Sequence, residues 1–251
     1  MMGQLTPSGD MSRVHGAMEI VAVRLEVSQM VVHRLSLSLS EDERARAGRF
    51  AFERDWRRFV VARGKLRELL GQRLDVRPES IQFAYGKHGK PVLDQPFCRS
   101  GLRFNVAHSA DLAVYAFSYE HEVGVDVEAV RALPDADDIA ARFFSQCEQE
   151  AYRALDSHHR QRGFFNCWTR KEAYIKALGD GLYHPLDGFD VTLAPGEPAR
   201  ILRVAGTPGE QCGWRLESFV PAPGFIGAAA VEEASAPVAA ATALSSAPAL
   251  L

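Results

Sequence analysis

The chain has 251 residues, of which 47% are hydrophobic and 24% charged, with 29 basic against 32 acidic side chains. This length and composition are typical of a globular protein with one large or two small domains, and such a chain buries a core without disulfides or structural metals. The net charge of −3 excludes a basic field over the whole surface, so any polyanion-binding site must be local.

Apolar patterns predict the elements of the first half. Glu19–Val27 alternates apolar with polar residues, which predicts a strand. Ser40 with Glu43 forms a capping box and marks the start of a helix. Helical spacing predicts a long helix over 51–70, with Gly71 as its expected end. Three further segments are strand-like: Ile81–Tyr85, Leu102–Ala107 and Leu112–Tyr119.

The second half continues the alternation of helices and strands. Val123–Glu128 follows the preceding strand after a turn of only three residues, which predicts a hairpin. Ser145 with Glu148 forms a second capping box, and a longer helix is expected over 164–178. Four strands are expected after it: Phe189–Leu193, Arg200–Val204, Trp214–Phe219 and Phe225–Val231.

The mixture of helices and hairpins predicts an α+β fold. Strand, helix and strands follow one another before about residue 120 and again after it, which favours two subdomains of similar size, 18–120 and 121–233, although no clear sequence repeat is detected. Residues 1–17 are expected to form a flexible leader. Residues 234–251, rich in Ala, Ser and Pro, are expected to form a disordered tail.

Neither the cysteines nor the apolar segments indicate secretion or a membrane span. The cysteines lack the spacing of a zinc site or a disulfide framework, which predicts free thiols in a reducing compartment; they are Cys98, Cys147, Cys167 and Cys212. Residues 1–17 contain no continuous apolar stretch of the kind found in signal peptides. No run of about 18 apolar residues occurs, so a cytoplasmic protein is expected.

Two acidic side chains share one face of the strand Val123–Glu128. Alternate side chains point the same way, so Asp126 and Glu128 lie on one face, with Cα atoms roughly 7 Å apart. This spacing suits the chelation of one hard cation, and Gly124 beside them leaves room for a ligand. A solvent-exposed outer face of an amphipathic strand is an equally good interpretation of the spacing alone.

A third carboxylate lies on the predicted helix over 164–178. Glu172 falls on the apolar stripe of Trp168 and Ile175, where a charge is costly unless a cation compensates it. Lys176, one turn further on, or a metal ion would supply that cation. Taken alone, an ordinary surface pair of Glu172 with Lys176 is the simpler interpretation.

Cations gather in a few places. Nine arginines and Lys65 lie between Arg44 and Arg73 against three acidic residues, which suits a phosphorylated ligand, nucleic acid or an acidic protein. A solvated arginine-rich face explains this run equally well, and no base-reading motif accompanies it. The loop Gly89-Lys90-Pro91 can approach a phosphate or can be an ordinary turn. His108, at a strand end, is a candidate phosphate ligand, base or structural hydrogen-bond partner.

Two of these segments together resemble the Sfp-type 4′-phosphopantetheinyl transferases. The family pattern G-[IV]-D-[IV]-E stands here as Gly124-Val125-Asp126-Val127-Glu128. The pattern W-[ST]-x-K-E-[AS]-x-x-K follows some forty residues later as Trp168-Thr169-Arg170-Lys171-Glu172-Ala173-Tyr174-Ile175-Lys176. The resemblance extends over roughly residues 19–231. It also includes Arg142-Phe143-Phe144-Ser145, Gly181-Leu182, Pro185-Leu186, the Arg49-Phe50 and Arg58 region, Gly89-Lys90-Pro91, Phe104-Asn105 and His108-Ser109.

The resemblance implies a pseudo-twofold pair of similar α/β subdomains and an enzyme. Such an enzyme transfers the 4′-phosphopantetheine arm of coenzyme A to a serine of an acyl or peptidyl carrier protein and releases adenosine 3′,5′-bisphosphate. The family is typically monomeric. The alternative from another functional class is a non-catalytic module on the same fold that binds a phospholigand or an acidic protein. Nucleic-acid binding is a third hypothesis, which we do not favour.

The resemblance also implies roles for single residues. Asp126, Glu128 and Glu172 match the family's carboxylates for Mg²⁺, with Mn²⁺ as an alternative ion, and Glu172 is a candidate base for the serine. Further matches bind coenzyme A: Lys176 at the pyrophosphate, His108 and Arg46 at the 3′-phosphate, and Lys90 and Arg58 at the nucleotide end. The 18–120 subdomain would then hold the nucleotide end and contact the carrier protein, and 121–233 would hold the metal and the catalytic helix. Ala107 and Glu43 depart from the pattern of many members, and the role of Lys171 stays open between ligand binding and helix order.

Overall fold

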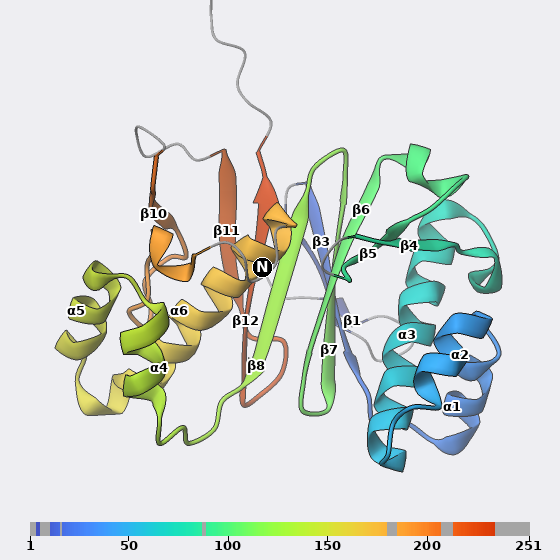
Figure 1. Cartoon of the computed structure of the whole chain (residues 1–251), viewed down its shortest axis with the longest axis horizontal. Coiled ribbons are helices and arrows are strands. Elements are labelled where there is room, and N and C mark those ends of the chain that lie inside the picture. The colour runs from blue at the N-terminus through green and yellow to red at the C-terminus, as the bar shows by residue number, and fades with distance from the viewer. Residues whose placement is uncertain are drawn as a thin grey trace, which may run out of the picture.

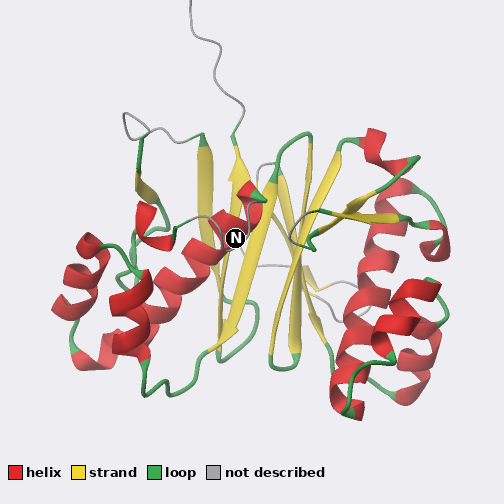
Figure 2. Cartoon of the chain, in the orientation of Figure 1, coloured by secondary structure: helices red, strands yellow, loops and turns green. Residues whose placement is uncertain are grey.

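The computed structural model describes residues 4–5, 11–15, 17–86, 89–179, 185–206 and 213–233. Two antiparallel sheets stand side by side at the centre, and helices cover the outer face of each (Figures 1 and 2). The first sheet has the order β1-β2-β3-β7-β6 and the second β11-β12-β8. Their strands are β1 (Gln4–Leu5), β2 (Met11–His15), β3 (Met18–Arg24), β6 (Leu102–Ser109), β7 (Leu112–Tyr119), β8 (Val123–Ala129), β11 (Trp214–Phe219) and β12 (Phe225–Glu232).

Helices and short strand pairs complete the two halves. In the N-terminal half they are α1 (Gln29–Ser36), α2 (Glu41–Ala47), α3 (Glu53–Leu74), β4 (Phe83–Tyr85) and β5 (Pro91–Leu93). In the C-terminal half they are α4 (Ala136–Phe143), α5 (Gln146–Ala154), α6 (Ser157–Leu178), β9 (Phe189–Val191) and β10 (Ile201–Val204). The strands of each pair, β4 with β5 and β9 with β10, are antiparallel.

The two halves repeat one topology. Each runs from a strand through three helices and a strand pair to two final strands. The strand pairing is the same in both halves. In the N-terminal half β7 lies between β3 and β6 and pairs with both. In the C-terminal half β12 lies between β8 and β11 and pairs with both. The long helices α3 and α6 have 22 residues each. The predicted α+β fold with a pseudo-twofold pair of subdomains is confirmed.

A buried polar network shows the same repeat at the level of side chains. In the N-terminal half the capping-box Glu43 accepts from Ser40 and binds the buried Arg67 of α3 at 2.7 Å. In the C-terminal half the capping-box Glu148 accepts from Ser145 and binds the buried Lys171 of α6 at 2.7 Å. Arg67 and Lys171 each stand fourteen residues after the first residue of their helix.

The buried cations make matching contacts beyond their helices. Arg67 donates to the carbonyls of Pro78 and Ile81 and lies over the ring of Phe83. Lys171 donates to the carbonyls of Leu186 and Phe189, both at 2.6 Å, and lies over the Phe189 ring. Each cation therefore ties its long helix to the chain that follows it. At this position arginine in one half takes the place of lysine in the other.

Several sequence expectations are wrong. Residues 11–15, expected in a flexible leader, form β2 and pair with β3. The expected hairpin after Leu112–Tyr119 does not form, because β3 and β6 occupy both edges of β7 and β8 pairs with β12 instead. Gly71 does not end its helix. It lies inside α3, and a Cβ added at Gly71 would stand 2.7 Å from the carbonyl oxygen of Val76. The helix is capped instead by Asp75, whose backbone is in the left-handed conformation. The expected tail 234–251 lies outside the described residues.

An apolar layer joins the two central sheets. Val123, Val125 and Val127 of β8 are buried against β3 and β7 residues such as Ile20 and Val114. The opposite face of β8 packs on α6 at Gly124. A Cβ at this glycine would lie 2.1 Å from the carbonyl oxygen of Ala173. Gly124 therefore allows the strand and the helix to approach each other, and the expectation that it makes room for a ligand is wrong.

Gly124→Ala is expected to lower the free energy of unfolding by about 3 kcal/mol, because the added methyl cannot fit without moving α6 away from β8. Urea unfolding followed by circular dichroism measures this change. Gly48→Ala is the control, since the nearest atom to its added methyl is 3.6 Å away. Equal stability of the two variants would contradict the close packing of α6 on β8.

Candidate active site

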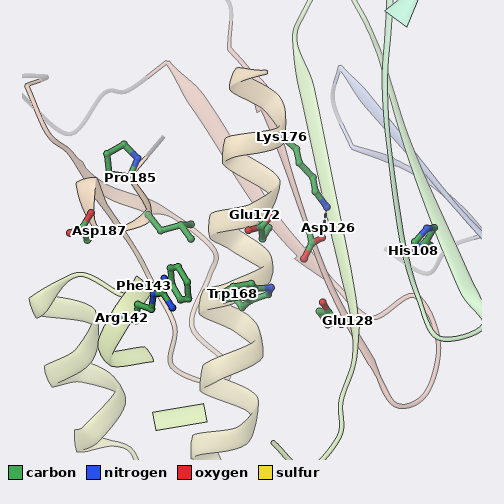
Figure 3. Close-up of a pocket in the computed structure, with 11 residues that line it drawn as sticks. His108, Asp126, Glu128, Arg142, Phe143, Trp168, Glu172, Lys176, Pro185 and Asp187 are labelled. Carbon is green, nitrogen blue, oxygen red and sulfur yellow. Dashed lines mark hydrogen bonds and ion pairs between the residues drawn. The ribbon is translucent and has the colours of Figure 1, made fainter. Parts of the chain in front are cut away.

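A cleft of about 690 Å³ lies along α6, with lining residues of β8 and β6 on one side of the helix and of α4 and the segment 185–187 on the other (Figure 3). The strand β8 supplies Asp126 and Glu128, the helix α6 supplies Glu172 and Lys176, and β6 supplies His108. Two elements thus bring the three predicted carboxylates and the predicted lysine to one place. The remaining lining residues are Arg142, Phe143, Trp168, Pro185, Leu186 and Asp187.

Asp126 is the most deeply buried carboxylate of the cleft, with an exposed fraction of 6%. Its Oδ1 accepts from Lys176 Nζ at 2.5 Å, the ion pair drawn in Figure 3. Its Oδ2 is buried and has no hydrogen-bond partner among the described residues. Burial raises the pKa of Asp126 to about 6; Lys176 opposes this rise, and the charges of Glu172 and Glu128 add to it.

The other two carboxylates are half-buried. Burial raises the pKa of Glu172, the nearby Lys176 opposes the rise, and the charge of Glu128 adds to it. Glu128 Oε2 accepts from Ser109 Oγ at 2.8 Å and lies 3.6 Å from Arg131. Three acidic groups therefore face one close ammonium group. An unpartnered buried oxygen and an excess of negative charge fit a divalent cation with oxygen ligands.

Two further cavities adjoin this cleft. One of about 510 Å³ is lined by Arg46, Arg58 and His108, with apolar residues such as Phe59 between them. One of about 280 Å³ is lined by Lys90 and Lys176. His108 and Lys176 each line the first cleft as well, so the three cavities share walls. All eight residues predicted to bind metal or coenzyme A line this connected set of cavities.

Two predicted coenzyme A residues also make contacts within the protein. Lys90 donates to the carbonyl of Lys176 at 2.7 Å, in the last turn of α6, where carbonyls lack helical partners. It thereby links the two halves, and burial lowers its pKa. Arg58 lies 3.3 Å from Glu26, and its buried Nε has no hydrogen-bond partner among the described residues.

Some charged residues in or near the sequence motifs stabilise the fold and do not line the cleft. Lys171 is fully buried in its ion pair with Glu148 and orders the helix, which resolves the question left open by the sequence. Glu43 is likewise buried against Arg67, away from the cleft cavities. Much of the arginine-rich run is used internally: Arg73, for example, binds Glu19 and the carbonyl of Leu69.

Several cleft residues were not given a role from the sequence. Arg142, Phe143 and Trp168 line the 690 Å³ cleft, and the rings of Phe143 and Trp168 are in edge-to-face contact with their centroids 5.9 Å apart. All three lie in segments that carry the family resemblance, and that resemblance was the sequence signal from which a role in the cleft could have been predicted. Ser109 lies in such a segment too. Gly181 and Leu182 of the resemblance, and Cys212, lie outside the described residues; Cys98, Cys147 and Cys167 are free thiols.

Comparison with known proteins decides the family. The model of the 4′-phosphopantetheinyl transferase superfamily matches residues 122–230, and that of the 4′-phosphopantetheinyl transferase N-terminal region matches residues 27–120. The 4′-phosphopantetheinyl transferase HetI of Nostoc sp. is 39% identical over 209 residues, which is 83% of this chain and 85% of the relative. The chain belongs to the 4′-phosphopantetheinyl transferase superfamily.

Other relatives agree with this assignment. The 4′-phosphopantetheinyl transferase Sfp of Bacillus subtilis is 30% identical over 66% of this chain and 72% of its own length. The human L-aminoadipate-semialdehyde dehydrogenase-phosphopantetheinyl transferase is 31% identical over 63% of this chain and 54% of its own length. The predicted family and enzyme class are confirmed, and transfer of phosphopantetheine from coenzyme A to a carrier protein is supported over the non-catalytic binding module. No helix in the described part of the chain is long and apolar enough to cross a membrane.

Proposed function

We propose that this 4′-phosphopantetheinyl transferase works with Mg²⁺ held by Asp126, Glu128 and Glu172, and that it modifies a serine of an acyl or peptidyl carrier protein. The observation that carries the proposal is the buried Asp126 Oδ2, which has no hydrogen-bond partner among the described residues and belongs to a cleft that Glu128 and Glu172 also line. A buried carboxylate oxygen without a partner is costly, and a hard cation would compensate it. Mn²⁺ is an alternative ion with the same oxygen preference.

The proposed bond change is the one that membership of the family implies. The serine oxygen of the carrier attacks the β-phosphorus of coenzyme A, and the P–O bond to the adenosine-bearing phosphate breaks, which releases adenosine 3′,5′-bisphosphate. Bound Mg²⁺ would supply charge stabilisation at the pyrophosphate oxygens. Lys176 stands beside Asp126 and would neutralise the same group. Glu172 would take up the proton of the serine hydroxyl, directly or through a water molecule.

The N-terminal half would hold the nucleotide end of coenzyme A. Arg46, Arg58 and His108 line one cavity next to the metal side, and such cations suit phosphate groups. We assign the 3′-phosphate to His108 and Arg46, and the nucleotide to Arg58 and Lys90. In this assignment residues 18–120 hold the nucleotide and contact the carrier, and residues 121–233 hold the metal and the catalytic helix.

His108→Ala is expected to raise the KM for coenzyme A by about 10-fold or more, because a charge-assisted hydrogen bond to the 3′-phosphate is lost. The KM for dephospho-coenzyme A, which lacks this phosphate, should change little. Initial rates with both donors measure the difference, and His33→Ala at an exposed position of α1 is the control. An equal loss with both donors would remove the 3′-phosphate from the role of His108.

We further propose that the protein acts as a cytoplasmic monomer without nucleic-acid ligands. The described free cysteines suit a reducing compartment. Arginines of α3 such as Arg67 and Arg73 bind internal partners, which reduces the positive charge that this helix offers to a nucleic acid.

A further inference from the structure

The strands β6 and β8 lie side by side although they belong to different halves and different sheets (Figure 1). Side chains of β6 accept hydrogen bonds from two backbone N–H groups of β8. Asn105 Oδ1 accepts from the N–H of Val125 at 2.9 Å, and Ser109 Oγ accepts from the N–H of Ala129 at 3.1 Å. The two acceptors are four residues apart on β6 and the two donors four residues apart on β8. The pairs therefore fix one register between the two halves of the protein.

Ser109 makes a second hydrogen bond that Asn105 does not. Its Oγ also donates to Glu128 Oε2 at 2.8 Å. A hydroxyl has only one hydrogen to donate. The Ser109 hydroxyl donates it to Glu128, and the Ser109 oxygen accepts from the Ala129 N–H at the same time. The residue before it, His108, lines both the metal cleft and the nucleotide cavity. One strand end of the N-terminal half thus reaches a carboxylate of the C-terminal half.

We propose that Ser109 is a positioning residue for the metal site: it holds the Glu128 carboxylate in the orientation in which it binds the cation, and it does so from the opposite half of the protein. This inference rests on the proposed function, because it takes Glu128 as a metal ligand. Carboxylates that bind metals are held by outer hydrogen bonds, and loss of such a partner costs about 10–100-fold in metal affinity. The metal site is then complete only when β6 and β8 are docked in register.

The test measures Mn²⁺ binding by electron paramagnetic resonance to protein loaded with coenzyme A, without a carrier protein, so that no turnover occurs. Ser109→Ala is expected to weaken Mn²⁺ binding by about 10–100-fold. Ser109→Thr keeps the hydroxyl and should rescue most of the affinity. Ser118→Ala is the matched control: it removes a buried hydroxyl of β7 that donates to the carbonyl of Ala17 and lines none of the three cavities, so the melting temperature should fall while Mn²⁺ affinity is kept.

The outcomes separate this inference from the function on which it rests. If the unaltered protein binds Mn²⁺ and Ser109→Ala binds it equally well, only the positioning role fails. If Ser118→Ala and Ser109→Ala weaken Mn²⁺ binding to the same extent, the loss follows from removing a buried hydroxyl in general and not from the bond to Glu128, which also overturns the proposal. If the unaltered protein binds no Mn²⁺ in the presence of coenzyme A, the metal site itself fails.

Discussion

Glu172→Gln is expected to lower kcat for carrier modification by at least about 10³-fold while coenzyme A still binds. The change removes the charge of a metal-binding carboxylate and the base that would accept the serine proton, and general-base catalysis alone contributes about 10²–10⁴-fold. Gln has nearly the same shape as Glu, so the half-buried packing of this side chain on α6 is kept. Initial rates of carrier modification and calorimetric binding of coenzyme A measure the two effects.

The control for this variant is Glu150→Gln, the same chemical change at an exposed position of α5. Its rate should stay within twofold of the unaltered protein. Retained turnover in Glu172→Gln would remove Glu172 from both of its proposed roles. Loss of coenzyme A binding together with turnover would instead place Glu172 in donor binding.

Lys171→Met is expected to lower the free energy of unfolding by about 3–5 kcal/mol, since it leaves the buried Glu148 carboxylate without its cation. Lys171 Nζ binds Glu148 at 2.7 Å and donates to two carbonyls in the chain that follows α6. Its loss would free that chain, which lines the cleft at Leu186. Chemical denaturation of the variant measures the change in stability.

The double variant Glu148→Gln/Lys171→Met is the control for the buried charge. With the carboxylate neutralised, part of the lost stability should return, because an unpaired buried charge costs more than an absent pair. A double variant no more stable than Lys171→Met would mean that the cost comes from lost carbonyl contacts and packing. A single variant as stable as the unaltered protein would contradict the structural role of Lys171.

Local signals predicted much of the fold. Both capping boxes begin helices, α2 and α5, because a serine and a glutamate three residues apart satisfy the free N–H groups of the first turn without outside help. The strands β7 and β11 have the predicted bounds, since β7 is a mostly apolar run and β11 begins and ends with an aromatic residue and has polar residues between its apolar ones. The start of α6 was missed because its first turns, from Ser157, are polar and exposed and show no apolar stripe.

Contacts between distant segments could not be predicted in the same way. The pairing of β8 with β12 joins residues about a hundred positions apart, whereas the expected hairpin needed only a three-residue turn. The sequence placed Asp126 and Glu128 on one face correctly, yet two features depend on contacts made by the folded chain. These are the burial of the Asp126 oxygen and the bond from Ser109 to Glu128. The close approach at Gly124 likewise became visible only when α6 was placed on its strand.

The most direct test of the central claim is the intact mass of an apo carrier protein after incubation with this chain, coenzyme A and Mg²⁺. We expect the carrier to gain the mass of one phosphopantetheine group, and the gain to disappear when its acceptor serine is changed to alanine. Fatty-acid, polyketide and peptide carriers tested side by side would identify the preferred substrate. An unchanged mass for every carrier, while coenzyme A binds tightly, would contradict the assignment as a transferase and favour a binding module.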